Sequence, residues 1–212
     1  MTEGMGLRER KKIETRRRLL AAATELFSER GFDQVSVAEI ADAADVSKMT
    51  VFNYFDSKED LVFEPLEEHV DDAARVVRER APGESAVAAL RRQFIDAVER
   101  RDASVGMSDS PVVLGIVRLI TETPALLARA HSFFARTQDR LTAVLVEEGE
   151  EPAIARIVAS QLLGTRDALL TENRRRLLAG EPADAVAADA VALAHRGFDL
   201  LEKGLGAYAT RG

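Results

Sequence analysis

Residues 46–61 read VSKMTVFNYFDSKEDL, and a short helix over residues 48–54 is the main feature of this stretch. At 100° per residue, Val51, Phe52 and Phe55 fall on one side of that helix, where they can pack on the helices before it. The opposite side carries Met49, Thr50, Asn53 and Tyr54. We therefore expect the second group of side chains to face outward.

Two earlier segments supply the helices for this packing. The sequence predicts a first helix over residues 12–30, which Gly31 ends. Ser36 and Glu39 have the spacing of a capping box and open a second helix that ends near Ala44. A tight turn then leads to Ser47, which can cap the helix at 48–54. This arrangement is typical of a helix-turn-helix, whose second helix enters the DNA major groove by its N-terminal residues.

The rest of the chain also shows helical spacing of apolar residues, with no sustained alternation that would indicate strands. Ser57 can cap a fourth helix that begins at Lys58 and ends at Pro82-Gly83. Later breaks divide residues 84–210 into about five helices, and they fall at 108–111, 123–124, 149–152 and 180–182. We predict an all-α protein of about nine helices.

Two domains are expected, with a boundary near residue 60 inside the fourth helix. Residues 1–60 would form the helix-turn-helix domain with a basic N-terminal arm. Residues 61–212 would form a larger helical domain for ligand binding and dimerisation. Because no flexible linker separates the two parts, movement in one can be transmitted to the other.

Charge is distributed unevenly along the chain. The formal net charge is −7, yet residues 1–58 hold ten basic and ten acidic groups and sum to zero, so the remainder carries all of the excess. Seven of those basic groups lie between residues 8 and 18, where only Glu9 and Glu14 oppose them. This asymmetry favours a polyanion as the partner of the N-terminal part, although a solvated helix end would give the same cluster.

Several classes of protein are disfavoured by composition. Cysteine is absent, which excludes disulfides, thiolate metal sites and a cysteine nucleophile. We expect a cytoplasmic protein, because the N-terminus resembles no signal peptide and no apolar run reaches the roughly 20 residues of a membrane span. There is no Gly-rich phosphate loop, no His-Glu-x-x-His pattern and no metal-ligand spacing among the three histidines. No enzyme, cofactor or metal site is predicted.

The outward side chains of the helix at 48–54 suit DNA. Asn53 can address an adenine edge, and Met49 can touch a thymine methyl group. Thr50 and Tyr54 can reach phosphates or bases. Lys58 stands at a helix N-terminus, where backbone donors can add to phosphate binding. The competing interpretation is a tight helical corner with polar surface residues.

The stretch from Ile13 to Leu61 resembles the N-terminal domain of TetR/AcrR-family transcriptional regulators. The resemblance rests on three consecutive motifs: AAxxLFxxxGF at 22–32, SVxxIAxxA at 36–44 and VSxxTxxxYFxSKxxL at 46–61. It implies about nine helices, a homodimer whose last two helices build a four-helix interface, and a small-molecule pocket in the larger domain.

The resemblance also implies which residues contact double-stranded DNA. They are Ser36, Lys48, Met49, Thr50, Phe52, Asn53, Tyr54 and Lys58. Two positions depart from the family pattern. Asp45 stands where Gly is common in the turn, and Asp also tolerates a left-handed conformation. Phe52 stands where Tyr is common and lacks the hydroxyl for a phosphate. We expect Arg8, Arg10, Lys11 and Lys12 to add salt-dependent affinity.

Polar residues in apolar settings mark a candidate effector pocket in the larger domain. Gln161 and Thr165 fall in a stripe with Ile154, Val158 and Ala168, so they are predicted to be buried and either hydrogen-bonded internally or part of a pocket. Gln93, Arg118, Thr121 and His131 complete the six candidate pocket residues, and Arg166 is a further polar residue in an apolar setting. Arg118 can meet an anionic group of a ligand or extend along the surface into water.

The last helix is apolar on two sides, with Val186, Leu193 and Leu200 on one of them. The other side carries Ala190, Ala194, Phe198, Leu201 and Leu205. Such a helix needs two partners, and we expect a homodimer through helices at about 152–178 and 183–209. A central helix within one monomer is the alternative.

We expect a homodimeric repressor that binds a palindromic operator and is released by a hydrophobic or amphipathic effector. Three alternatives are weighed against it. One is a DNA-binding regulator that a protein partner controls or that activates transcription, another is an enzyme, and the third is an interaction module without DNA binding.

Overall fold

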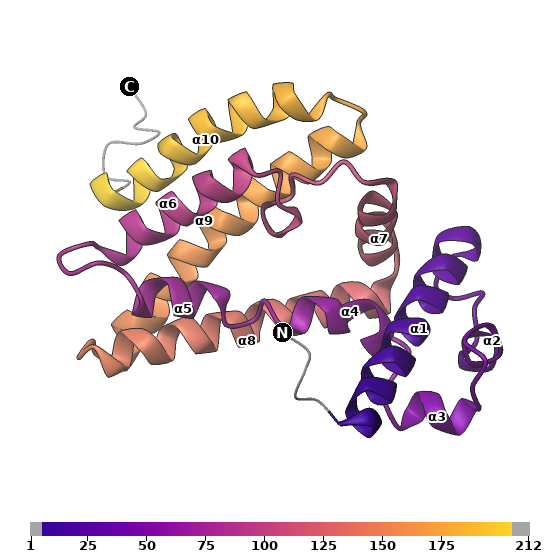
Figure 1. Cartoon of the computed structure of the whole chain (residues 1–212). Helices are drawn as coiled ribbons and strands as arrows, with labels where there is room; N and C mark the ends of the chain where they lie inside the picture. The colour runs from indigo at the N-terminus through magenta and orange to yellow at the C-terminus, as the bar shows by residue number, and fades with distance from the viewer. Residues whose placement is uncertain (1–5, 205–212) are drawn as a thin grey trace. The chain divides into compact units, whose positions relative to one another are not determined.

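The computed structural model describes residues 6–204, apart from the side chain of Leu7, and these residues form helices joined by turns and loops (Figure 1). The α-helices are α1 (Leu7–Arg30), α2 (Val37–Ala43), α3 (Lys48–Phe52), α4 (Asp60–Glu67), α5 (Asp72–Arg78), α6 (Ala86–Glu99), α7 (Pro111–Glu122), α8 (Pro124–Glu147), α9 (Pro152–Leu178) and α10 (Ala183–Lys203). A 3-10 turn, η1 (Ala103–Val105), follows α6. The predicted all-α class is confirmed.

The expected fourth helix is two helices, which corrects the prediction of one helix from Lys58 to Pro82. α4 and α5 are separated by a turn over residues 68–71. Pro65 lies inside α4 and has no N–H to donate to the carbonyl of Leu61, so this helix is weakened in its middle. If α4 and α5 are counted as one interrupted helix, residues 6–204 contain nine α-helices, in agreement with the predicted number.

Helix ends also differ from the prediction at the N-terminus. α1 begins at Leu7 rather than at residue 12, so the basic segment is part of the helix. α3 ends at Phe52, with Asn53 as its C-cap, rather than at residue 54. Near the C-terminus, residues 205–209 of the last predicted helix, and Leu205 with them, lie outside the described residues.

The described chain divides into two compact units. The first contains the residues up to Glu67 and Gly115–Ala130, and the second contains Glu68–Leu114 and the residues from His131 onward. The boundary near residue 60 was predicted to separate the helix-turn-helix domain from the domain for ligand binding and dimerisation, and it stays a prediction. By compactness, the first unit continues through α4 and also includes Leu126, whose side chain is fully buried in its core.

The core of the first unit is built from the inner faces of α1 to α4. Its buried side chains include Leu19, Ala23, Phe27, Phe32, Val35, Ile40, Ala41, Ala44, Val51, Phe55, Leu61, Val62 and Phe63. The rings of Phe27 and Phe32 lie 5.1 Å apart across the bend that Gly31 makes after α1. This core fixes the short helix α3 from behind.

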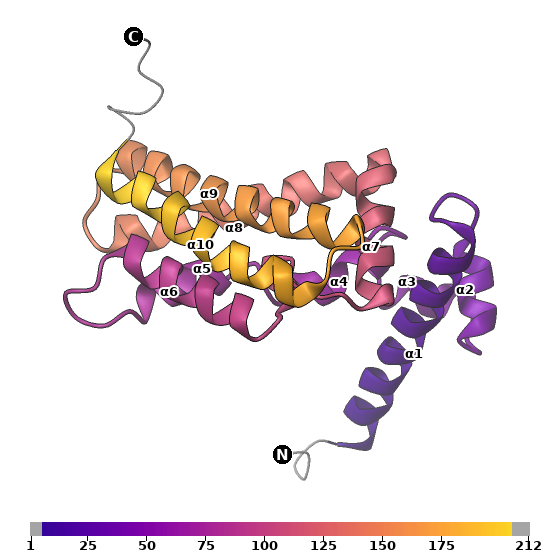
Figure 2. The ribbon, with the colours of Figure 1, turned by 90° about the horizontal axis from the view of Figure 1, so that it is seen from above.

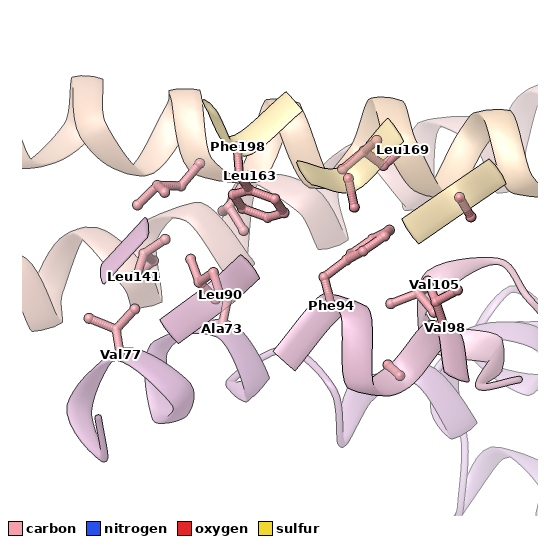
Figure 3. Close-up of a cluster of buried hydrophobic side chains, with 14 of the residues drawn as sticks. Ala73, Val77, Leu90, Phe94, Val98, Val105, Leu141, Leu163, Leu169 and Phe198 are labelled. Atoms are coloured by element: carbon pink, nitrogen blue, oxygen red, sulfur yellow. The ribbon is translucent and has the colours of Figure 1, made fainter. Parts of the chain in front are cut away.

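In the second unit α10 packs on α6 and α9 (Figures 1 and 2). Figure 3 shows the apolar core of this unit, in which the rings of Phe94 and Phe198 lie 6.3 Å apart. The loop around η1 is held against α9, since buried Asn173 Nδ2 donates to the carbonyl of Val105 at 2.9 Å.

Among the described residues, no single helix is long and apolar enough to cross a membrane. The bent pair of α7 and α8 meets that test by length and composition only.

Candidate nucleic-acid interface

α3 is held in place by side chains that point into the core of the first unit. Val51 and Phe55 are buried as predicted, but Phe52 is 44% exposed, which corrects its assignment to the packed side. Because α3 ends at Phe52, the spacing of 100° per residue no longer applies at Phe55. The Phe55 side chain reaches the core from the turn after the helix. Phe52 therefore belongs to the outward face.

The turn between α2 and α3 has the conformation that the sequence suggested. Asp45 adopts φ +52°, in the left-handed region, and the N–H of Val46 donates to the carbonyl of Ala41 at 2.9 Å. Ala44 is the C-cap of α2, and Val46 is the second residue after it. A hydrogen bond from that position back into the helix is typical of a helix that ends with a left-handed residue. The turn thus fixes the start of α3 relative to α2.

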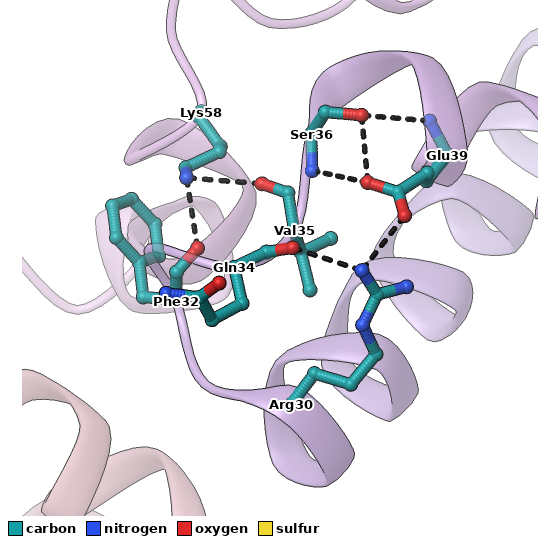
Figure 4. Close-up of polar contacts among 7 residues, drawn as sticks. All are labelled: Arg30, Phe32, Gln34, Val35, Ser36, Glu39 and Lys58. Carbon is teal, nitrogen blue, oxygen red and sulfur yellow. Dashed lines mark hydrogen bonds and ion pairs between the residues drawn. The ribbon is translucent and has the colours of Figure 1, made fainter.

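The start of α2 has the predicted capping box (Figure 4). The N–H of Ser36 donates to Glu39 Oε2 at 2.8 Å, and the Glu39 N–H donates to Ser36 Oγ at 3.3 Å. Arg30 Nη2 donates to Glu39 Oε1 at 2.7 Å. Hydrogen bonds from the Ser36 backbone and hydroxyl, and then from Arg30, lower the pKa of Glu39 to about 2. Ser36 is exposed beside this network.

The outward face of α3 brings together four of the residues predicted to contact DNA. Lys48 and Asn53 are exposed, and Met49 is 69% exposed. Lys48 Nζ lies 6.0 Å from the centroid of the Phe52 ring. These four side chains combine a cation, an amide and two apolar groups on one exposed surface, which we call the α3 surface.

Thr50 and Tyr54 are less exposed to solvent than the residues of the α3 surface. Thr50 is half-buried, its hydroxyl lies 2.8 Å from Ser47 Oγ, and its N–H donates to the same oxygen at 3.1 Å. Tyr54 is half-buried and packs against the core with its ring body. Both residues therefore help to hold α3 while keeping part of their surface in solvent.

Lys58 is tied into the fold, which the sequence did not suggest. Its Nζ donates to the carbonyls of Phe32 at 2.8 Å and Val35 at 3.0 Å, and it lies 4.0 Å from the centroid of the Phe32 ring (Figure 4). These partners stand 26 and 23 residues earlier in the chain, so no local sequence signal could have revealed them. An ammonium has three donors, and two of them are used here.

α4 begins at Asp60 rather than at Lys58 as predicted, and hydrogen bonds between Ser57 and Asp60 close the turn before it. The Ser57 N–H donates to Asp60 Oδ2 at 2.9 Å, and the Asp60 N–H donates to Ser57 Oγ at 3.2 Å. Fewer backbone donors therefore remain for a phosphate than the sequence led us to expect.

The basic residues near the N-terminus lie along the first three turns of α1. Arg8, Arg10, Lys11 and Lys12 are all exposed. Further along the helix, Arg16 Nε donates to Glu64 Oε1 at 2.6 Å, and Arg17 Nη2 donates to Glu14 Oε2 at 2.8 Å. Seven basic side chains thus lie in the first half of α1, between residues 8 and 18.

The six candidate pocket residues are spread over both units. Arg118 and Thr121 belong to the first unit and are exposed, and Thr121 Oγ1 donates to the Val117 carbonyl at 3.0 Å. His131 is exposed in the second unit.

The two residues of the stripe on α9 differ in burial. Gln161 is exposed in the single chain, because that face of α9 turns away from the core, so the burial that its stripe suggested does not occur within one chain. Thr165 is half-buried, and its Cγ2 lies 3.3 Å from the place that a Cβ at Gly197 would take.

The remaining candidate, Gln93, accepts a hydrogen bond from Arg166 Nη2 at 3.0 Å. From residue 6 to residue 204 there is no group of three or more acidic or histidine side chains able to hold a metal ion.

Comparison with known proteins agrees with this geometry. Residues 19–64 match the model of the family described as bacterial regulatory proteins, tetR family. These residues include the turn at Asp45, all of α2 and α3, and most of α4.

Two curated relatives are transcriptional regulators by name. The HTH-type transcriptional regulator TcmR of Streptomyces glaucescens is 32% identical over 160 residues, which cover 74% of this chain and 65% of TcmR. The HTH-type transcriptional repressor KstR2 of Rhodococcus jostii is 39% identical over 90 residues, which cover 42% of this chain and 44% of KstR2. The chain thus spans less than two thirds of the length of either relative.

A solved structure supports the fold over nearly the whole chain. NalD, the secondary repressor of the MexAB-OprM multidrug efflux pump in Pseudomonas aeruginosa, matches with a TM-score of 0.59 at 21% identity, covering 86% of this chain and 96% of NalD. The N-terminal motifs and the family model lead to one assignment: residues 19–64 form a domain of the tetR family of bacterial regulatory proteins.

Proposed function

We propose that this protein is a DNA-binding transcriptional regulator, which acts as a homodimeric repressor on a palindromic operator and is released by a small-molecule effector. The observation that carries the proposal is the α3 surface: Lys48, Met49, Phe52 and Asn53 are exposed on a helix whose back is fixed by buried Val51 and Phe55. Two apolar side chains exposed on a five-residue helix suit a surface that a partner covers. The family description favours a regulator over an enzyme.

The chemistry of the α3 surface suits the major groove. The Asn53 amide can pair with an adenine edge, Lys48 with a guanine or a phosphate, and Met49 with a thymine methyl group. Thr50 and Tyr54 are proposed as supporting contacts, because each is also held by the fold. Lys58 bonds the carbonyl of Val35, the residue before Ser36, and both Lys58 and Ser36 are proposed to contact the DNA backbone.

The positive beginning of α1 supplies the sequence-independent part of this proposal. Arg8, Arg10, Lys11 and Lys12 are proposed to neutralise phosphates, each contributing to an affinity that falls as salt rises. In an acidic chain, such a local cluster also orients the molecule toward DNA.

Exposed faces of α9 and α10 support the homodimer. On α9, Ile154 and Ile157 are about half exposed, and a Cβ added at Gly164 would meet open space. On α10, Leu193 and Leu200 are also exposed. Two copies of this pair of helices would cover the four apolar side chains in a twofold interface, and Gln161 and Ala168 would be covered with them.

α4 is proposed to transmit the effector signal, because ion pairs fix it at both ends within the first unit. Arg16 holds Glu64 from α1, and Arg129 Nη2 donates to Asp60 Oδ1 at 2.8 Å. An effector that moves α4 would shift the α3 surface with it. A coupling of roughly 1–3 kcal/mol would change operator affinity by about 5- to 150-fold.

The experiment that tests the proposal is selection of genomic DNA fragments by the purified protein, followed by sequencing. We expect enrichment of a palindromic site, which Asn53→Ala combined with Met49→Ala abolishes. Glu25→Ala, at an exposed position of α1 away from α3, serves as the matched control and should leave enrichment unchanged. A reporter gene behind the selected site should be expressed less when the protein is present, whereas an activator would raise expression.

Loss of enrichment in the control variant, or equal enrichment with the double variant, would refute the α3 surface as the reading element. If ligand-stripped protein enriches no site at moderate salt, the regulator function itself is wrong.

A further inference from the structure

Arg166 occupies a core position of α9. The side of this helix that faces its own unit carries Leu162, Arg166, Leu169 and Asn173 at alternating spacings of four and three residues, and the other three are buried. A guanidinium in such a stripe is unusual, because charged side chains rarely lie inside a fold unless they are paired.

Arg166 has no anionic partner among residues 6–204. Its Nη2 donates to the neutral Gln93 Oε1 at 3.0 Å, and its Nε is buried without any hydrogen-bond partner. Other arginines of the same unit are paired with carboxylates: Arg91 with Asp199 and Glu202, Arg176 with Glu181 and Asp189, and Arg80 with Glu148. Arg166 lacks such a counter-ion, and Arg174 on the same helix also has a buried Nε without a hydrogen-bond partner.

The surroundings of Arg166 penalise its charge. Burial lowers the pKa of Arg166, and the only opposing influence is the negative charge of Asp72. That carboxylate is already bound by His69 Nδ1 at 2.8 Å and by Arg75 Nη2 at 2.6 Å. As a whole residue Arg166 is half-buried, so part of its surface lies in solvent.

We propose that the Arg166 guanidinium, oriented by Gln93, binds the carboxylate of the effector. This inference rests on the proposed ligand-released function and specifies its ligand class: a monoanionic carboxylic acid with an apolar body. An arginine fork matches a carboxylate with two parallel hydrogen bonds and supplies the charge that the site lacks.

Two features of the site support this ligand class. Within three residues of Gln93 on α6 and of Arg166 on α9, the buried apolar side chains include Leu90, Phe94, Leu163 and Leu169 (Figure 3). They suit a hydrocarbon or ring next to the acid. The negative charge of Asp72 opposes a second charge on the ligand, which favours a monoanion over a phosphate dianion.

The test is calorimetric titration of the full-length protein with straight-chain carboxylates from butyrate to decanoate, with octanol as an uncharged probe and octyl phosphate as a dianionic one. We expect at least one carboxylate to bind more tightly than either octanol or octyl phosphate. In Arg166→Met its affinity should fall at least tenfold, while the affinity for octanol stays within about twofold. The control variant is Arg92→Met. Arg92 precedes Gln93 in the chain, is exposed and pairs with Glu84, so this variant should bind the carboxylate like the unmodified protein.

Thermal unfolding separates the ligand role from a structural one. If Arg166 awaits a ligand, Arg166→Met should keep or raise the melting temperature of the ligand-free protein, since an unpaired buried charge is removed. A lowered melting temperature together with no Arg166-dependent carboxylate binding would overturn the proposal and assign Arg166 to the fold. DNA selection without added carboxylate is scored separately, so failure of the regulator function is distinguishable from failure of this site.

Discussion

At the scale of single residues, Asp45 determines how tightly α2 and α3 are joined. Its φ of +52° strains any residue with a Cβ, and Asp tolerates this conformation better than most. We predict that Asp45→Val destabilises the protein by roughly 1–2 kcal/mol, whereas Asp45→Gly is neutral or stabilising. Urea unfolding measures both. Asp42→Val, at an exposed helical position of α2, is the control, and an equal loss there would contradict the backbone explanation.

Glu39 links the capping box to pH. Because its pKa is about 2 in the folded protein against an ordinary 4.5, its contribution to stability is fully present above pH 4.5 and is lost as pH falls toward 2. We predict that the melting temperature of the unmodified protein falls more steeply on acidification from about pH 6 to about pH 3 than that of Glu39→Gln. Parallel slopes for the two proteins would show that Ser36 and Arg30 do not hold the carboxylate in solution.

At the scale of elements, the loop around η1 depends on a close approach to α9. A Cβ at Gly106 would stand 2.5 Å from the carbonyl oxygen of Leu170, and Gly106 has φ +75°. We predict that Gly106→Ala costs more than about 2 kcal/mol, since backbone strain and overpacking add. Gly83→Ala is the matched control: its φ is +81° with nothing within 4 Å, so only the backbone term of about 1 kcal/mol applies. Calorimetric unfolding of both variants tests the difference.

At the scale of the whole molecule, the exposed apolar faces of α9 and α10 predict self-association. Ile157 is 53% exposed on α9, so Ile157→Glu should leave the fold intact and would place a charge in the proposed interface. We expect the unmodified protein to run as a dimer and this variant as a monomer in size-exclusion chromatography with light scattering. Val112→Glu, at a similarly exposed apolar position of α7, should remain dimeric. A monomeric unmodified protein would exclude the twofold operator complex.

The sequence by itself determined the helical class, the three N-terminal helices, the capping box of α2 and the left-handed turn at Asp45. These features depend on residues at most five apart, whose spacing and hydrogen-bonding groups can be read along the chain. The α3 surface was largely predictable for the same reason, because one short helix carries it.

Only the tertiary structure decided the features that depend on distant residues. It showed that Lys58 bonds the carbonyls of Phe32 and Val35, that residues 115–130 complete the core of the first unit, and that Gln161 is exposed in the single chain. It also left Arg166 without a carboxylate partner. Helical spacing fixes which side of a helix is apolar, but which groups meet across that side depends on how the helices pack.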